Sequence, residues 1–179
     1  MMGEMFSSPA RPFFQSSSVL SLKPISMIAY SSFIISHFQK ARKQISTEAI
    51  QYLYEKFDGT TWYIQKICNE LYASAEDGHI CDISDVDEAI DYAVEEKSDT
   101  YQDLIARLPA KQKALLIALA HSGKDVRPTG TPFIRKYHLG SPSAVQRSMV
   151  GLMDKDIVSN HNGQYYIFDY FLTMWLKKK

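Results

Sequence analysis

The chain has 179 residues, and 45% of them are hydrophobic, which suffices for one ordinary domain or two small ones with a buried core. Its 20 basic and 20 acidic residues are unevenly placed: 9 Lys or Arg and 16 Asp or Glu precede Leu108, whereas 11 and 4 follow it. This asymmetry predicts two modules, of which the second would be the one to bind a polyanion. No stretch is apolar for long enough to span a bilayer and no basic leader is present, so we expect a cytoplasmic protein without a membrane partner.

The first segment predicts a single strand followed by a helix. Residues 1–23 hold clusters of serine and one strand-like run, Val19–Leu22, for which the sequence offers no partner strand. Because an apolar strand of this kind exposes backbone donors and acceptors, we expect residues up to Leu22 to be either mobile or docked at a non-native site or a dimer contact. From Pro24 to about Lys40 the apolar residues recur at helical spacing, with proline at the first helical position.

Three more helices are predicted before Leu108. Ser46 is a candidate N-cap for the first, which Gly59 ends. The second covers residues 62–75 and is capped by one of the two threonines before it. The third follows Ser84, whose spacing to Asp87 is that of a capping box with aspartate in place of glutamate. The expected core stripe of the second helix comprises Trp62, Tyr63, Ile67 and Leu71.

The basic half begins with three predicted helices. Pro109 opens the first, which stops at Gly123. A short helix covers residues 133–137. Ser141 then caps a third helix, which begins with proline and extends to about Lys155.

Two short strands follow these helices, at residues 157–159 and 164–168. The segment Asn160–Gly163 between them contains an Asn-Gly pair, a strong signal for a β-hairpin turn. A last amphipathic helix covers residues 171–175. The sequence therefore predicts a mainly α fold: a small helical bundle, then a winged helix-turn-helix with a β-hairpin wing.

Catalytic motifs are missing from the sequence. No GxxxxGK[ST] phosphate loop, GxSxG elbow, HExxH helix or EF-hand loop occurs. Cys68 and Cys81 are 13 residues apart, without a CxxC pair or clustered histidines, which argues against zinc and against a disulfide framework. We therefore expect no catalytic, cofactor-binding or metal-binding residues, and two reduced cysteines with structural roles.

Several short stretches carry a resemblance to a known family. They are, in chain order, Met5–Phe6, Arg11–Phe14, Leu20–Pro24, Phe57–Gln65, Ser143–Arg147 and Asp169–Leu176. In these stretches the sequence resembles the archaeal-type ATPases of the AAA+ superfamily. The resemblance implies that residues 1–23 are the end of a nucleotide-binding core, residues 24–107 a helical lid, and residues 108–179 a winged helix. It also implies that the parent protein binds ATP and magnesium through a core that lies upstream of Met1 and would be the chain's main partner.

Candidate binding residues are expected on the exposed face of the helix after Ser141 and around the wing. They are Ser143, Gln146, Arg147, Val150, Lys155, Lys136, Asn160 and Asn162. Duplex DNA is one possible ligand, because basic side chains beside a helix-turn-helix can neutralise phosphates. A protein partner, or the acidic first half of the chain, is the other, because Val150, Gly151 and Met153 would make this face apolar.

Two functions remain open at this stage. The chain is either the regulatory lid and winged-helix region of an ATPase, or a separate DNA-binding transcription regulator with a helical effector domain. The strand at Val19–Leu22 favours the ATPase region, because a self-contained regulator has no need of an unpaired strand.

Overall fold

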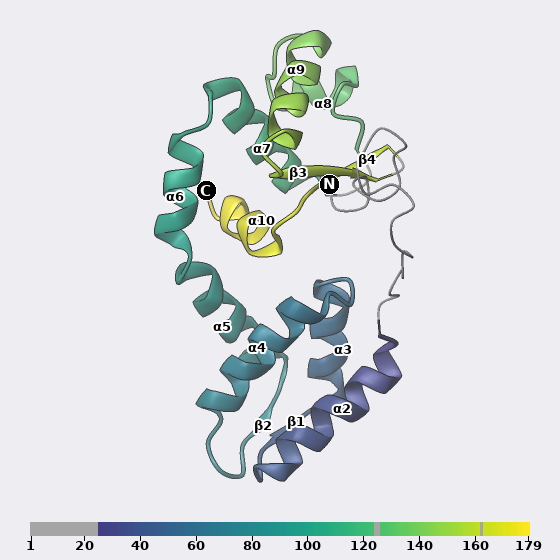
Figure 1. Ribbon diagram of the computed structural model, residues 1–179, viewed down its shortest axis with the longest axis vertical. Helices are drawn as coiled ribbons and strands as arrows, with labels where there is room; N and C mark the ends of the chain where they lie inside the picture. The colour runs from purple at the N-terminus through teal and green to yellow at the C-terminus, as the bar shows by residue number, and fades with distance from the viewer. Residues whose placement is uncertain (1–24, 124–125, 162) are drawn as a thin grey trace, which may run out of the picture.

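The computed structural model describes residues 25–123, 126–161 and 163–179, and it divides into a helical bundle and a winged helix (Figure 1). The predicted strand at Val19–Leu22, and the dimer contact predicted from it, lie outside the described residues. The bundle contains α2 (Met27–Lys40), β1 (Gln44–Ile45), α3 (Thr47–Lys56), α4 (Thr61–Ser74), β2 (Ile80–Cys81), α5 (Ile83–Glu95) and α6 (Ser98–Ala106).

The helix starts of the bundle follow local capping chemistry. The Ser46 hydroxyl accepts a hydrogen bond from the Ala49 amide at 3.1 Å, which confirms the predicted cap of α3. Helix α2 begins at Met27 and not at Pro24. Ser26 is extended, and its hydroxyl caps the helix by accepting from the Ala29 amide.

The prediction of a cap at Ser84 was wrong. Asp82 is the N-cap of α5, and its carboxylate accepts from the amides of Ser84 and Asp85. The Asp85 carboxylate in turn accepts from the Asp82 amide at 2.7 Å, which completes a capping box two residues earlier than predicted. The helix can start here because β2 ends at Cys81, directly before the cap.

A two-stranded parallel sheet, which the sequence did not predict, joins two loops of the bundle. Gln44 pairs with Ile80 and Ile45 with Cys81, so the link between α2 and α3 is held beside the link between α4 and α5. Strands of two residues are too short for any alternating pattern. The sheet fixes the loop that leads into α5.

The bundle core is formed by apolar residues from each of its longer helices. The side chains of Leu53, Phe57 and Ile67 are fully buried. Tyr63 and Leu71, which belong to the predicted stripe on α4, expose only 9% and 2% of their surface. Trp62 departs from the predicted core, because 54% of it is exposed. It lies at the rim, where its ring meets the edge of Tyr63.

The winged helix has the predicted order of three helices, a hairpin and a last helix. Its elements are α7 (Ala110–Ser122), α8 (Thr131–Lys136), α9 (Pro142–Met153), β3 (Val158–His161), β4 (Gln164–Ile167) and α10 (Tyr170–Lys177). The strands form an antiparallel pair from Val158 opposite Ile167 to His161 opposite Gln164. At the tip, the Asn160 side chain accepts from the Gly163 amide at 2.9 Å.

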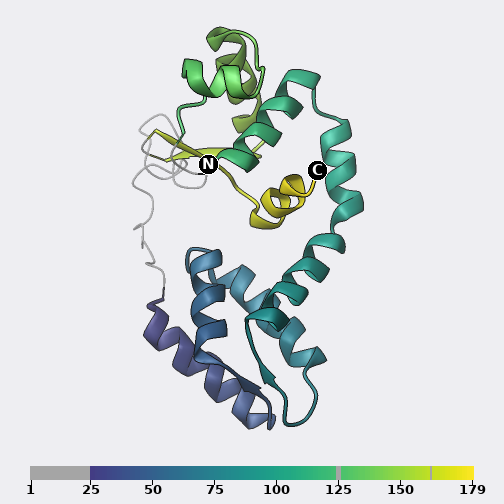
Figure 2. The same ribbon diagram turned by 180° about the vertical axis from the view of Figure 1, so that it is seen from behind.

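Helix α10 lies between the two parts of the molecule, with the hairpin and α7 on one side and the bundle on the other (Figures 1 and 2). It packs against α7 and β4 of the winged helix and against α5 and α6 of the bundle. The predicted boundary at residues 107 and 108 falls in the short link between α6 and α7, and the division into functional modules there stays a prediction. None of the described helices is long and apolar enough to cross a membrane.

The wing turn yields a first testable prediction. Gly163 has a φ of +83°, and a side chain at this position would meet no atom within 4 Å. Gly163→Val should therefore destabilise the protein only through its backbone conformation, by roughly 1–2 kcal/mol, with the helices still folded. Chemical denaturation followed by circular dichroism measures this, with His161→Val on the adjacent strand as a control. Equal stability of the two variants would contradict the assignment of a left-handed turn.

Candidate nucleic-acid or protein interface

Helix α9 presents one buried and one exposed face. The Ser141 hydroxyl caps its start by accepting from the Ala144 amide, and Pro142 occupies the first turn, as predicted. Its buried face packs on α7 and β3. The buried residues include Val145, Met149 and Leu152, and the exposed ones are Ser143, Gln146, Arg147 and Val150. The separation of faces predicted from the helical period is therefore confirmed.

Gly151 does not belong to the exposed face. A side-chain carbon added there would lie 2.2 Å from Nε2 of Gln112 on α7, so the glycine leaves room for the Gln112 amide between α9 and α7. Met153 is half-buried against the core. Of the three residues expected to make this face apolar, only Val150 is exposed, with 44% of its surface accessible.

The other candidate residues lie on neighbouring elements. Lys136 is exposed on α8, with its ammonium 5.0 Å from the centre of the Tyr137 ring. Lys155 follows α9 and donates to the Gly151 carbonyl at 3.1 Å. The Asn160 side chain is engaged in the wing turn, and Asn162 lies outside the described residues.

Arg147 is the most available charged group on this face. Within the part of the chain that the structure describes, its guanidinium has no hydrogen bond or ion pair. Ser143 is engaged with the capping serine, since the two hydroxyls lie 3.1 Å apart. The exposed face of α9 therefore offers one available cation, the amide of Gln146 and the apolar surface of Val150.

The orientation of this face depends on Asp169, which sequence reasoning did not single out as a cap. The Asp169 carboxylate accepts from the backbone amides of Phe171 and Leu172, and so caps α10. It also accepts from two tyrosine hydroxyls, that of Tyr63 on α4 at 3.2 Å and that of Tyr101 on α6 at 2.8 Å. One carboxylate thus caps a helix of the winged helix and ties that helix to the bundle.

Aromatic packing surrounds this carboxylate. Phe171 of α10 is fully buried, and its ring meets Phe57 and Tyr63 edge to face at centroid distances of 5.7 and 4.9 Å. The ammonium of Lys97 lies 5.1 Å from the Trp62 ring and 5.4 Å from the Phe171 ring, at the rim. The contact between the two halves therefore has a buried aromatic centre with a charged edge.

Polar contacts continue along α10. The indole nitrogen of Trp175 donates a buried hydrogen bond to the Ser98 hydroxyl at 3.0 Å. Lys178 forms an ion pair with Asp91 of α5 at 2.8 Å. One ion pair thus joins the acidic helices to the basic half, next to α10 and not through the exposed face of α9, so docking of that face on the acidic half stays a prediction.

The tyrosines of the joint have raised pKa values. Burial, and then the negative charge of Asp169, raise the pKa of Tyr63 to about 12. Burial and the hydrogen bond to Asp169 raise the pKa of Tyr101 as well. Both hydroxyls are thus held as protonated donors to the carboxylate across the neutral range.

A signal for Asp169 was present in the sequence. An aspartate directly before an amphipathic helix is a common N-cap, and Asp169 opens one of the stretches that carry the family resemblance. The two tyrosine partners could not be identified, because Tyr63 and Tyr101 lie 106 and 68 residues away in the chain.

A second prediction concerns the carboxylate itself. Asp169→Ala removes the cap of α10 and leaves two tyrosine hydroxyls without their acceptor, so it should lower the free energy of unfolding by about 3 kcal/mol. Urea denaturation measures the loss. Asp154→Ala, at an exposed aspartate after α9, is the matched control and should change stability little. A loss no larger than that of the control would show that Asp169 does not hold the joint.

A third prediction follows from the raised tyrosine pKa. Because Tyr63 titrates near 12 when folded against a usual value of 10.0, its contribution to stability is complete below pH 10 and is lost as the pH rises towards 12. Tyr63→Phe should therefore show a shallower decline of unfolding free energy over this alkaline range than the wild type. Tyr166→Phe, at an exposed tyrosine of the wing, should decline like the wild type. Parallel curves for all three proteins would contradict the raised pKa of Tyr63.

Comparison with known proteins supports the winged helix and the resemblance to an ATPase. Residues 99–178 match a family described as a probable winged helix domain. The chain is also similar in fold to a Walker-type ATPase of Pyrococcus abyssi, with a TM-score of 0.62 and 15% identity over 93% of this chain and 46% of that one. The chain thus spans about half the length of that ATPase, and a search of curated proteins gave no match. These findings support a winged helix in residues 99–178 and a fold similar to part of a Walker-type ATPase.

Proposed function

We propose that the chain is the non-catalytic lid and winged-helix region of an AAA+ or STAND-type ATPase, and that it acts as an interaction module coupled to the nucleotide state of the core. ATP and magnesium would bind to that core, and no residue of this chain is assigned to them. The core of the same protein would be the first partner. The observation that carries the proposal is the joint between the bundle and α10, centred on Asp169 and Phe171.

The joint supports mechanical coupling between the two parts. A lid that moves with the nucleotide state can displace a binding face only if the connection between them is stiff. Here α10 packs on the bundle and on α7, and α7 in turn packs on α9. A rotation of the bundle would therefore carry the exposed face of α9 with it, through packed helices and not through a flexible linker.

The charge distribution favours a protein partner for this face. Part of the positive charge of the second half is used inside the molecule, since Lys178 pairs with Asp91 and Lys179 lies over the Trp175 ring. These cations follow the end of α10 and are not on α9 with Arg147. Val150 adds exposed apolar surface that a helix reading phosphates does not need.

Duplex DNA is the second candidate, as part of the same ATPase or of a DNA-binding transcription regulator. It is favoured by one observation, the exposed pair of Gln146 and Arg147 on the first turns of α9. Both side chains have the chemistry to contact base edges or phosphates, and the recognition helix of helix-turn-helix proteins contacts DNA with its N-terminal residues.

A fourth prediction separates these two candidates. If the α9 face docks on protein, duplex DNA should show no saturable binding in fluorescence anisotropy at low salt, whatever its sequence. If instead DNA is the ligand, the logarithm of the affinity should fall with the logarithm of the salt concentration, with a slope of about 0.9 for each phosphate contact. Arg147→Ala should then reduce the magnitude of this slope by about 0.9, which corresponds to one lost phosphate contact. Lys111→Ala, at an exposed cation of α7, is the control and should leave the slope unchanged. Saturable binding with a slope reduced only in Arg147→Ala would overturn the protein-docking proposal.

A further inference from the structure

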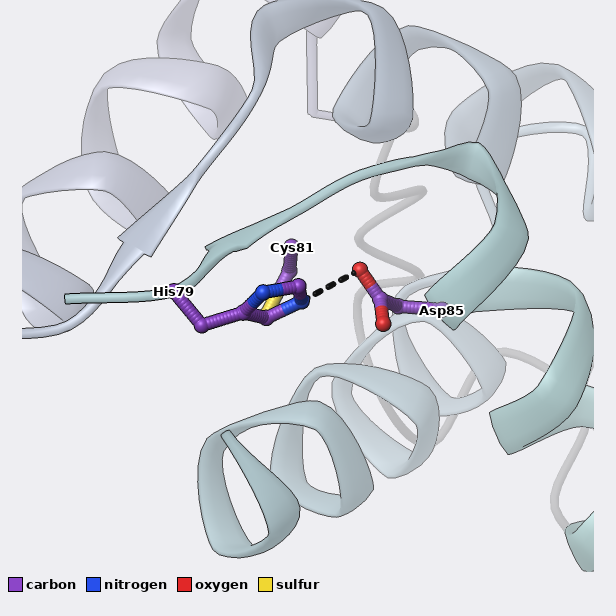
Figure 3. A group of neighbouring side chains, drawn as sticks. All are labelled: His79, Cys81 and Asp85. Atoms are coloured by element: carbon purple, nitrogen blue, oxygen red, sulfur yellow. Dashed lines mark hydrogen bonds and ion pairs between the residues drawn. The ribbon is translucent and has the colours of Figure 1, made fainter. Parts of the chain in front are cut away.

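The bundle contains a cluster of metal-ligating side chains far from the joint. His79, Cys81 and Asp85 each offer one ligand atom, and these three atoms lie within 4.8 Å of one another. Figure 3 shows the His79 ring turned towards the Asp85 carboxylate, with the Cys81 sulfur next to the ring. They line an open cavity of about 720 Å³ between α4 and α5.

Three local features of the chain bring these groups together. The turn before β2 contains Gly78 at a φ of +84° and is closed by a hydrogen bond from the His79 amide to the Glu76 carbonyl. The β1–β2 pairing holds Cys81 in place. The capping box at the start of α5 then fixes the Asp85 carboxylate beside the ring, with Nε2 of His79 at 2.9 Å from Oδ2 of Asp85.

The spacing of Cys68 and Cys81 gives no sign of this cluster. The histidine lies two residues before Cys81, and the carboxylate lies four residues after it. Such a short His-x-Cys-x-x-x-Asp pattern is not specific by itself. It gains meaning only because the turn, the strand and the helix start place the three side chains around one point.

The surroundings favour a cation over nucleophilic chemistry. Cys81 is 1% exposed, so its thiol is not accessible enough to act as a nucleophile on a substrate from solution. Three further carboxylates, of Glu70, Glu76 and Glu88, line the cavity. The Lys43 ammonium is engaged by Tyr72, as it donates to the Tyr72 carbonyl and lies 5.0 Å from the centre of the Tyr72 ring.

We propose that His79, Cys81 and Asp85 form a zinc-binding site with one open coordination position. Imidazole, thiolate and carboxylate together are typical zinc ligands, whereas magnesium and calcium bind oxygen and avoid sulfur. Three protein ligands leave a fourth tetrahedral position, which water or an acidic group at the cavity wall can fill. On binding, the Cys81 thiol releases its proton to solvent, and the sulfur–metal bond replaces the sulfur–hydrogen bond.

The site would stabilise the bundle where its secondary structure is shortest. The three ligands come from a turn, a two-residue strand and the first turn of α5, so one ion would hold together a region that has few backbone hydrogen bonds. The ion pair between His79 and Asp85 would give way to shared coordination, which requires only small side-chain movements because the ligand atoms are already adjacent.

The test uses the untagged chain, since an affinity tag of histidines would bind zinc itself. Zinc should bind with one-to-one stoichiometry in calorimetry and raise the melting temperature. Co²⁺ in place of zinc should give a thiolate charge-transfer band in the near ultraviolet together with tetrahedral visible bands. His79→Gln should lower the affinity for zinc by more than the roughly 10–100-fold that the loss of an outer-sphere partner of a ligand causes.

Matched variants decide the outcome. Cys81→Ser should abolish the thiolate band, and His121→Gln, at an exposed histidine at the end of α7, should leave zinc affinity unchanged. Cys68→Ser should keep the band, because this thiol is outside the cluster. Because the His79 side chain is half-exposed, its variant should fold even if Cys81→Ser does not. No zinc binding by the wild type, or equal affinity in His79→Gln, would overturn the proposal.

Discussion

The position of α10 depends on the requirement that the Asp169 carboxylate be surrounded by donors. A largely buried carboxylate is costly unless hydrogen bonds satisfy it, and here two helix amides and two tyrosine hydroxyls do so. The amides belong to α10 and the hydroxyls to α4 and α6. Any rotation of α10 relative to the bundle would remove at least one of these donors. The orientation of the winged helix is therefore set by a polar constraint inside an aromatic contact.

Features that rest on neighbouring residues could be predicted from the sequence. Ser46 and Ser141 were identified as caps because the hydroxyl and the amide that it binds are three residues apart. The wing was identified because the turn requires a positive φ that glycine provides at residue 163. The start of α5 was misplaced for the same local reason: Asp82 and Ser84 are both good caps, and the choice between them depended on where β2 ends.

Features that depend on distant contacts could not be predicted. Nothing near Trp62 in the sequence distinguishes it from its buried neighbour Tyr63, and only the position of Phe171 shows which ring is central and which lies at the rim. Of the candidate binding residues, those on α9 were correctly placed on an exposed face because a helix has a fixed period. Whether they bind anything is not encoded in that period, and their role stays a prediction.

The charge asymmetry of the chain has a different meaning once the fold is known. An exposed pair such as Lys178 and Asp91, with side chains 48% and 68% accessible, contributes on the order of 0–1 kcal/mol and cannot by itself hold two halves together. The aromatic joint supplies the affinity, while opposite net charges disfavour other arrangements of the two parts. A basic second half is therefore explained in part by the acidic first half. For this reason the net charge alone is weak support for DNA binding, and the inference has to rest on Arg147 and its immediate surroundings on α9.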